Sequence, residues 1–212
     1  EKLDELAWKV KADADYIYSP IVVDGAVYFS IPDGHLKAVD AKTGGELWKY
    51  KPDRRISTCP TVHGGSVYFG SSGNDIWDLN GHLHSVNVKT GLERWRFKTE
   101  RGLWSSPTIA GDEIYFGTSR GNLYSLNRFT GREKWLFKTE RKIVSSPAVA
   151  EGIVYFSNLN GDCYAINSKT GQEQWKVNIN KAGWFCPIVS DGMVYIASRS
   201  GFIIALNAKN GH

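Results

Sequence analysis

The chain has 212 residues, a formal net charge of +4, 13% aromatic residues, 22 glycines and one methionine. This length suits one large domain or two small ones, and the aromatic and glycine content favours strands and tight turns over helical bundles. The positive charge is spread along the sequence, which argues against a dedicated nucleic-acid binder. No apolar stretch of about 18 residues is present, so we expect no membrane insertion by this segment.

Neither the amino end nor the cysteines fix the compartment of the chain. The first residues, EKLDELAWKV, include no initiator methionine and no apolar signal-peptide core, which predicts a processed form or a segment of a longer polypeptide. Cys59, Cys163 and Cys186 follow no CxxC or zinc-ligand spacing. Their odd number leaves at least one free thiol unless a partner supplies another.

Five repeats follow one another along the chain, and each holds a Trp, a Pro and a Tyr in a fixed register. The Trp precedes the Pro by 12 residues, and the Tyr follows the Pro by 8. Successive prolines are 40, 47, 40 and 40 residues apart. The Trp residues are Trp8, Trp48, Trp95, Trp135 and Trp175, the prolines are Pro20, Pro60, Pro107, Pro147 and Pro187, and the tyrosines are Tyr28, Tyr68, Tyr115, Tyr155 and Tyr195.

Each repeat divides into four short β-rich runs separated by glycine-containing turns. A period of about 40 residues with four strands predicts one propeller blade per repeat. The chain is therefore expected to form a single all-β domain over 1–212, a five-bladed β-propeller of four-stranded antiparallel blades. The blades are expected at about 16–50, 56–98, 104–138, 144–178 and 184–212, the last one completed by residues 5–11.

The turn before the outermost strand recurs almost unchanged, as AVDAKTGGELW, SVNVKTGLERW, SLNRFTGREKW and AINSKTGQEQW. Its Asp or Asn can accept hydrogen bonds from nearby backbone N–H groups, and its Gly supplies a positive φ. The Trp four residues beyond the Gly is expected to pack between neighbouring blades.

These turns resemble the tryptophan-docking motif, A-x-D-x-x-T-G-x-x-x-W, of the PQQ-like (quinoprotein) propeller repeat family, and the resemblance covers essentially the whole chain. For the alcohol dehydrogenases of that family, the resemblance implies a vicinal cysteine pair, a calcium site and a stacking Trp around the PQQ cofactor. The chain has no adjacent cysteines, and a five-bladed ring is narrower than such a chamber requires. We therefore expect no cofactor, PQQ included; the resemblance slightly favours an extracytoplasmic location.

The two ends of the chain are complementary. The last repeat reads ALNAKNGH and stops before its Trp, whereas LAWKV around Trp8 has the composition of an outer strand. We expect the N-terminal strand to join the last blade and close the ring at five, which leaves no open edge. Two alternatives are an array cut at both ends and part of a larger ring, because familiar family members have seven or eight blades.

We find no catalytic or metal-binding constellation in the sequence and predict that the chain is not an enzyme. The inner-strand stretches SPIVV, CPTVH, SPTIA, SPAVA and CPIVS contain no carboxylate pair for glycoside hydrolysis. No His or acid recurs at a fixed offset to activate the serines of WSSP and VSSP. His82 and His84 alternate on one strand and can face the same side. Because the sequence pattern places no further ligand beside them, they predict no metal site.

One column just before each proline holds small residues: Ser19, Cys59, Ser106, Ser146 and Cys186. Small size suits the crowded innermost strand, and this packing role is the preferred interpretation. A cross-channel disulfide or a reactive thiol is the alternative.

The inter-blade connections are expected to share one face with the turns between strands two and three. Six residues before the prolines stand Ala14, Arg54, Arg101, Arg141 and Lys181. Four cations at equivalent positions suggest a site for an anion or an acidic partner. Because the preceding residue is often acidic, as at Asp53, Glu100 and Glu140, exposed turn pairs that neutralise one another are the alternative.

Aromatic residues on the same connections are candidate interface anchors: Trp104 and Trp184 three residues before proline, and Tyr18 and Phe185 two before. A seven-residue insertion in the second repeat adds Trp77, flanked by Asp75 and Asp78. Trp77 either contacts a partner or ligand or caps its own blade.

Together these features predict a non-catalytic binding or scaffold module, a sensor or interaction domain of a larger protein. The expected partner is a protein or peptide, or a small anionic ligand, on the face that bears the insertion. The alternative is a carbohydrate-binding, lectin-like propeller. The candidate binding residues are Trp77, Trp104, Trp184, Tyr18, Phe185, Arg54, Arg101, Arg141 and Lys181.

Overall fold

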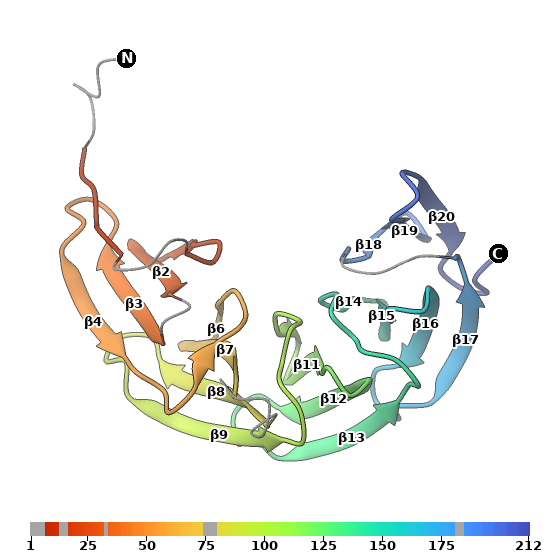
Figure 1. Ribbon diagram of the computed structural model, residues 1–212, viewed down its shortest axis with the longest axis horizontal. Coiled ribbons are helices and arrows are strands. Elements are labelled where there is room, and N and C mark those ends of the chain that lie inside the picture. The colour runs from red at the N-terminus through yellow and green to blue at the C-terminus, as the bar shows by residue number, and fades with distance from the viewer. Residues whose placement is uncertain (1–6, 13–16, 32–33, 74–79, 181–184) are drawn as a thin grey trace.

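A computed structural model describes residues 7–12, 17–31, 34–73, 80–180 and 185–212. The described residues form strands and turns and contain no helix, arranged as five successive antiparallel sheets. The all-β prediction and the four-stranded antiparallel blades are thereby confirmed. Figure 1 shows the sheets side by side along an arc, with the outer strands β4, β9, β13 and β17 on its convex side.

The longest strands belong to the second sheet, which follows a four-stranded first sheet. Sheet one has the order β1 (Ile21–Val23), β2 (Ala26–Ile31), β3 (His35–Asp40) and β4 (Glu46–Tyr50). In sheet two, β5 (Arg55–Ile56) and β6 (Thr61–His63) both pair with β7 (Ser66–Ser72), which continues to β8 (Gly81–Asn87) and β9 (Glu93–Thr99).

The other three sheets repeat the same meander. Sheet three has β10 (Thr108–Ala110), β11 (Glu113–Gly117), β12 (Asn122–Asn127) and β13 (Glu133–Lys138). Sheet four has β14 (Ala148–Ala150), β15 (Ile153–Ser157), β16 (Asp162–Asn167) and β17 (Glu173–Asn178). Sheet five has three strands, β18 (Ile188–Ser190), β19 (Met193–Ala197) and β20 (Ile203–Asn207).

The core lies between blades, because the second strand of a blade is covered on both faces. In β11, Ile114, Tyr115 and Phe116 are all fully buried. Such an unbroken run of β-branched and aromatic residues is typical of a strand that packs on both sides.

Each outer-strand Trp docks on the turn of the following blade, as predicted. Trp95 Nε1 donates a hydrogen bond to the carbonyl of Arg128 at 3.0 Å. Its ring lies flat on Gly131, where an added Cβ would meet a ring carbon at 2.7 Å. Tyr68, on the second strand of the same blade, donates to the same Arg128 carbonyl at 3.2 Å, so two aromatic rings of one blade bind the turn of the next.

The same docking recurs along the arc with Trp8 on the Ala41 carbonyl, Trp48 on Val88, Trp135 on Ser168 and Trp175 on Ala208. Each of these rings covers the turn glycine, in turn Gly44, Gly91, Gly171 and Gly211.

The small residues of the inner column connect neighbouring blades. The backbone N–H of Cys59 donates to Ser106 Oγ at 3.2 Å, that of Ser106 to Ser146 Oγ at 2.9 Å, and that of Ser146 to Cys186 Sγ at 3.3 Å. All three cysteines of the chain are free thiols in the structure. The residues of this column therefore share a short side chain with an acceptor atom, in agreement with the packing interpretation.

The predicted closure of the ring at five blades is not what the structure has. Figure 1 shows an open arc whose two ends lie apart. Residues 7–12 form no strand, and the β18–β20 sheet keeps three strands. Trp8 does dock on the first blade as an outer-strand Trp should, but the strand pairing expected with β20 is not made.

An exposed apolar surface remains on the last blade as a result. Ile188, Phe202 and Ile203 are 67%, 65% and 80% exposed. The repeated docking contacts, such as that of Trp95, join each blade to the next, and complementary ends of the chain are not enough to bring the first and last blades together.

Candidate functional site

A cavity of about 450 Å³ opens where the connections of the second, third and fourth blades meet. Its lining combines one large aromatic ring, that of Trp104, with three cations and several small polar groups. The lining residues are Ser72, Gly73, Arg101, Gly102, Trp104, Ser119, Arg120 and Lys142.

Leu103 anchors the connection that carries Trp104. Its side chain is fully buried, and it forms an isolated antiparallel bridge with Thr118 of the third blade. Its carbonyl accepts a hydrogen bond from Ser57 Oγ of the second blade at 2.6 Å. Because alternate residues of an extended segment point to opposite sides, the buried Leu103 directs its neighbour Trp104 outward, where it is 47% exposed.

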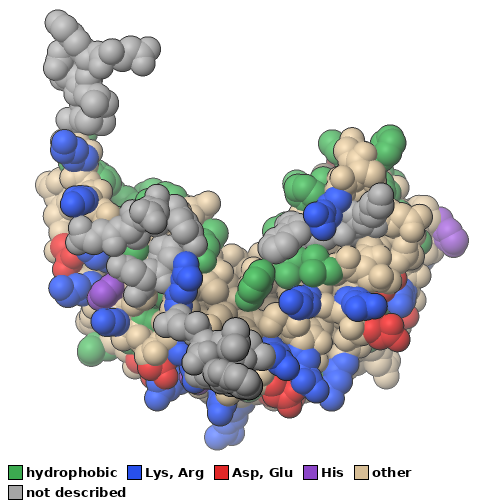
Figure 2. Space-filling view, viewed as in Figure 1, with side chains coloured by type: hydrophobic (Ala, Val, Ile, Leu, Met, Phe, Trp, Pro, Cys, Tyr) green, Lys and Arg blue, Asp and Glu red, His purple; other side chains and the backbone are tan. Residues whose placement is uncertain are grey.

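The electrostatic character of the cavity is positive. Arg120 pairs with Glu100 at 3.1 Å, but both side chains are more than half exposed, so water screens this pair strongly. Lys142 Nζ lies 6.0 Å from the centroid of the Trp104 ring, at the outer limit of a cation–π contact. Figure 2 shows Lys and Arg side chains gathered along the lower, convex rim of the arc.

The lining offers groups that bind anions and apolar side chains. Arginine offers planar, bidentate donors for carboxylates, and an exposed indole offers apolar area with little conformational entropy to lose. No carboxylate, histidine or thiol belongs to the lining of the cavity.

The cavity brings together two of the predicted binding residues, Arg101 and Trp104. The other predicted residues that the structure describes lie elsewhere: Arg54 before β5, Arg141 on the exposed connection before β14, Tyr18 before β1 and Phe185 before β18. Trp77, Lys181 and Trp184 lie outside the described residues.

Arg120 and Lys142 are cavity residues that the sequence pattern did not single out. Arg120 belongs to the turn between β11 and β12, and Lys142 follows Arg141 in the next connection. The turn SRGN does differ from the corresponding turn of the fourth repeat, LNGD, which has Asn160 in the place of Arg120, so this Arg was a visible departure from the repeat.

The docking turns and the meander blades define a β-propeller of the PQQ-repeat class. The chain belongs to this family: residues 79–212 match the family model described as outer membrane protein assembly factor BamB. Residues 4–78 match the related model described as the β-propeller domain of glucose, ethanol and alcohol dehydrogenases.

Curated relatives of both kinds are similar to parts of the chain. BamB of Xanthomonas campestris is 35% identical over 71 residues, which cover 29% of this chain and 18% of that protein. The quinohemoprotein alcohol dehydrogenase ADH-IIG of Pseudomonas putida is 47% identical over 49 residues, 22% of this chain and 7% of the enzyme. The matched segments thus span less than a fifth of the length of either relative.

Solved structures share the fold. The crystal structure of BamB from Moraxella catarrhalis superposes with a TM-score of 0.81 at 20% identity, over 97% of this chain and 62% of that one. The computationally designed Ika8 protein gives 0.78 at 16% identity, over 91% and 60%. Within the described residues, we find no helix of the length and apolar character that a membrane crossing requires.

Proposed function

We propose that this chain is a non-catalytic protein-binding module that holds an acidic segment of a partner protein at the Trp104 cavity. The observation that carries the proposal is one exposed indole set among Arg101, Arg120 and Lys142. Exposed Trp and Arg are the residues most enriched at the centres of protein interfaces.

The family supports the same function. Its matched relatives include BamB, which by its name is an assembly factor of outer membrane proteins. A scaffold role in such a complex needs a docking face, and it also fits an extracytoplasmic location and the role of an interaction domain within a larger protein. Curated quinone-dependent dehydrogenases match up to 36% of the chain by sequence, more than the 29% that BamB matches. The non-catalytic proposal therefore rests on the cavity, whose lining contains no acid–base group.

The partner chemistry follows from charge and shape. Three cations without a lining carboxylate favour Asp- and Glu-rich segments, and the Trp104 ring favours an apolar or aromatic side chain beside them. An extended peptide fits an open cavity that spans two inter-blade connections and two turns better than a compact small molecule does.

An array of acidic extended peptides tests this proposal, followed by measurement of affinity for the best binder in solution. We expect the double reversal Arg101→Glu and Arg120→Glu to weaken binding at least about tenfold, because charge complementarity becomes repulsion. Raising the salt concentration from 50 to 200 mM is expected to weaken the wild-type complex and to have less effect on this variant.

The matched control is the reversal Arg132→Glu and Lys169→Glu. These exposed residues lie in the docking turns at the opposite ends of the strands, and the control changes the net charge equally. Equal loss in the two double variants would assign binding to overall charge and overturn the proposed site. Selective binding to one sugar class on a glycan array, with no peptide binding, would instead support the lectin alternative.

A further inference from the structure

The second blade departs from its neighbours at two positions on β8. His84 occupies the position of Tyr124 in β12 and Tyr164 in β16, counted from the Asn that ends each strand. Tyr124 stacks on Phe116, and His84 keeps this packing by stacking on Phe69, with ring centroids 4.8 Å apart. The imidazole therefore fills the place of a phenol ring but presents nitrogen atoms there.

His82 is the second departure and stands where the third blade has Asn122. It is only 8% exposed, and its Nδ1 is a buried nitrogen with no hydrogen-bond partner in the described structure. Buried polar atoms in folded proteins are nearly always satisfied, so an orphaned ring nitrogen points to a ligand.

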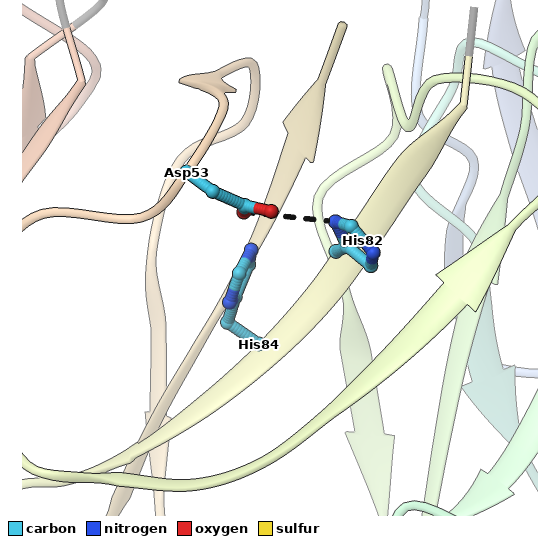
Figure 3. Close-up of side chains that lie close together, drawn as sticks. All are labelled: Asp53, His82 and His84. Carbon is cyan, nitrogen blue, oxygen red and sulfur yellow. Dashed lines mark ion pairs between the residues drawn. The ribbon is translucent and has the colours of Figure 1, made fainter.

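Asp53 completes a cluster with these two histidines. It lies on the connection between β4 and β5, and its Oδ1 is 3.8 Å from His82 Nδ1. One ligand atom from each of the three residues lies within 4.8 Å of the other two. Figure 3 shows the carboxylate of Asp53 turned toward His82, with a ring nitrogen of His84 directed to the same space.

The surroundings of His84 hold its ring in an orientation suited to a metal ligand. Its Nδ1 lies 3.4 Å from Glu93 Oε2 and its Nε2 lies 2.9 Å from Ser71 Oγ. Since Ser71 pairs directly with His82 across the sheet, Nε2 is on the side of the cluster. When Nδ1–H donates to Glu93, Nε2 keeps its lone pair, as in carboxylate–histidine–metal arrangements.

Charged groups of both signs lie around the cluster: Asp53 and Glu93 are anionic, and Arg54, Arg96 and Lys98 are cationic. The case for a metal ion therefore rests on the geometry of the three ligands and on the unsatisfied Nδ1 of His82.

We propose that Asp53, His82 and His84 bind a divalent transition-metal ion of the Zn²⁺ type, with water as the fourth ligand and Glu93 as the residue that orients His84. Two imidazoles with one carboxylate suit zinc and its neighbours better than Ca²⁺ or Mg²⁺, which prefer oxygen ligands alone. Zinc ligands lie about 3.4 Å apart in a tetrahedral shell, so small side-chain rotations close the site. The half-exposed Asp53 provides the route of entry.

Such an ion would fasten the connection between blades one and two to β8. It would act at a place distinct from the Trp104 cavity, since none of its ligands lines that cavity. The proposal is therefore independent of the proposed partner binding.

Titration of the chelator-treated chain with ZnCl₂ in a calorimeter tests the site. We expect one Zn²⁺ per chain with a Kd of about 1 μM or lower and a rise in melting temperature, because the ion binds only the folded chain. With Co²⁺, we expect the visible absorption of a tetrahedral complex.

The decisive variant is His82→Asn with His84→Tyr, which installs the residues of the third blade and so preserves the packing on Phe69. It is expected to fold and to bind Zn²⁺ at least about 100-fold more weakly, since both nitrogen ligands are lost. His63→Ala, at an exposed histidine of β6, is the control and should bind as the wild type does. Undiminished binding by the double variant, or no stoichiometric binding by the wild type, would overturn the proposal.

Discussion

Replacing Gly131 with Ala is expected to destabilise the chain by about 3–4 kcal/mol. Gly131 has a φ of 68°, a conformation that costs an L-residue about 1–2 kcal/mol. Its new Cβ would also meet the Trp95 ring at 2.7 Å, which forces the ring off its turn and adds about 1–3 kcal/mol of overpacking. Urea unfolding followed by tryptophan fluorescence measures the loss.

Gly111→Ala separates the two causes. Gly111 has a φ of 59°, and nothing lies within 4 Å of its added Cβ. This control therefore carries the backbone strain alone and should lose about 1–2 kcal/mol. Equal losses in the two variants would mean that Trp docking does not stabilise the contact between blades.

Leu103→Ala is the second large effect, with an expected loss of about 3 kcal/mol. Leu103 is fully buried. A Cβ added at Gly70 would lie only 2.8 Å from the Cβ of Leu103, so the Leu103 side chain fills the space beside this glycine of β7. Truncating a buried leucine costs about 2–5 kcal/mol because the cavity collapses only in part. Chemical denaturation monitored by circular dichroism is the measurement.

Leu92→Ala is the matched control for this truncation. Leu92 is 70% exposed in a docking turn, and its loss should change stability by less than about 0.5 kcal/mol. A Leu103 variant as stable as the Leu92 variant would show that the connection does not pack between blades two and three.

The parts of the fold that follow from local repetition could be predicted. The contact of Trp95 with Gly131 recurs in every repeat at one spacing, because the same turn and the same outer strand are used each time. The angle between neighbouring blades has no such pattern in the sequence. It depends on how side chains such as Trp95 and Leu103 fill the interface between two blades.

The candidate sites could be predicted only in part for a related reason. Arg101 and Trp104 share one connection, so the sequence alone places them near each other, whereas Arg120 and Lys142 reach the same cavity from a turn and from another connection. Likewise, alternation places His82 and His84 on one face of β8, but nothing in the local pattern predicts that Asp53, on a connection from the preceding blade, meets them. Residues from different blades come together through packing.

The affinity of the chain for its best acidic peptide, measured for Trp104→Ala beside Phe129→Ala, tests the proposed binding face most directly. The two rings are similarly exposed, at 47% and 55%, but Phe129 lies in a docking turn and outside the cavity. Loss of the Trp104 ring should weaken binding at least about tenfold, as expected for an interface anchor, and loss of Phe129 should leave it unchanged. An unchanged affinity for Trp104→Ala, or an equal loss in both variants, would contradict binding at this cavity.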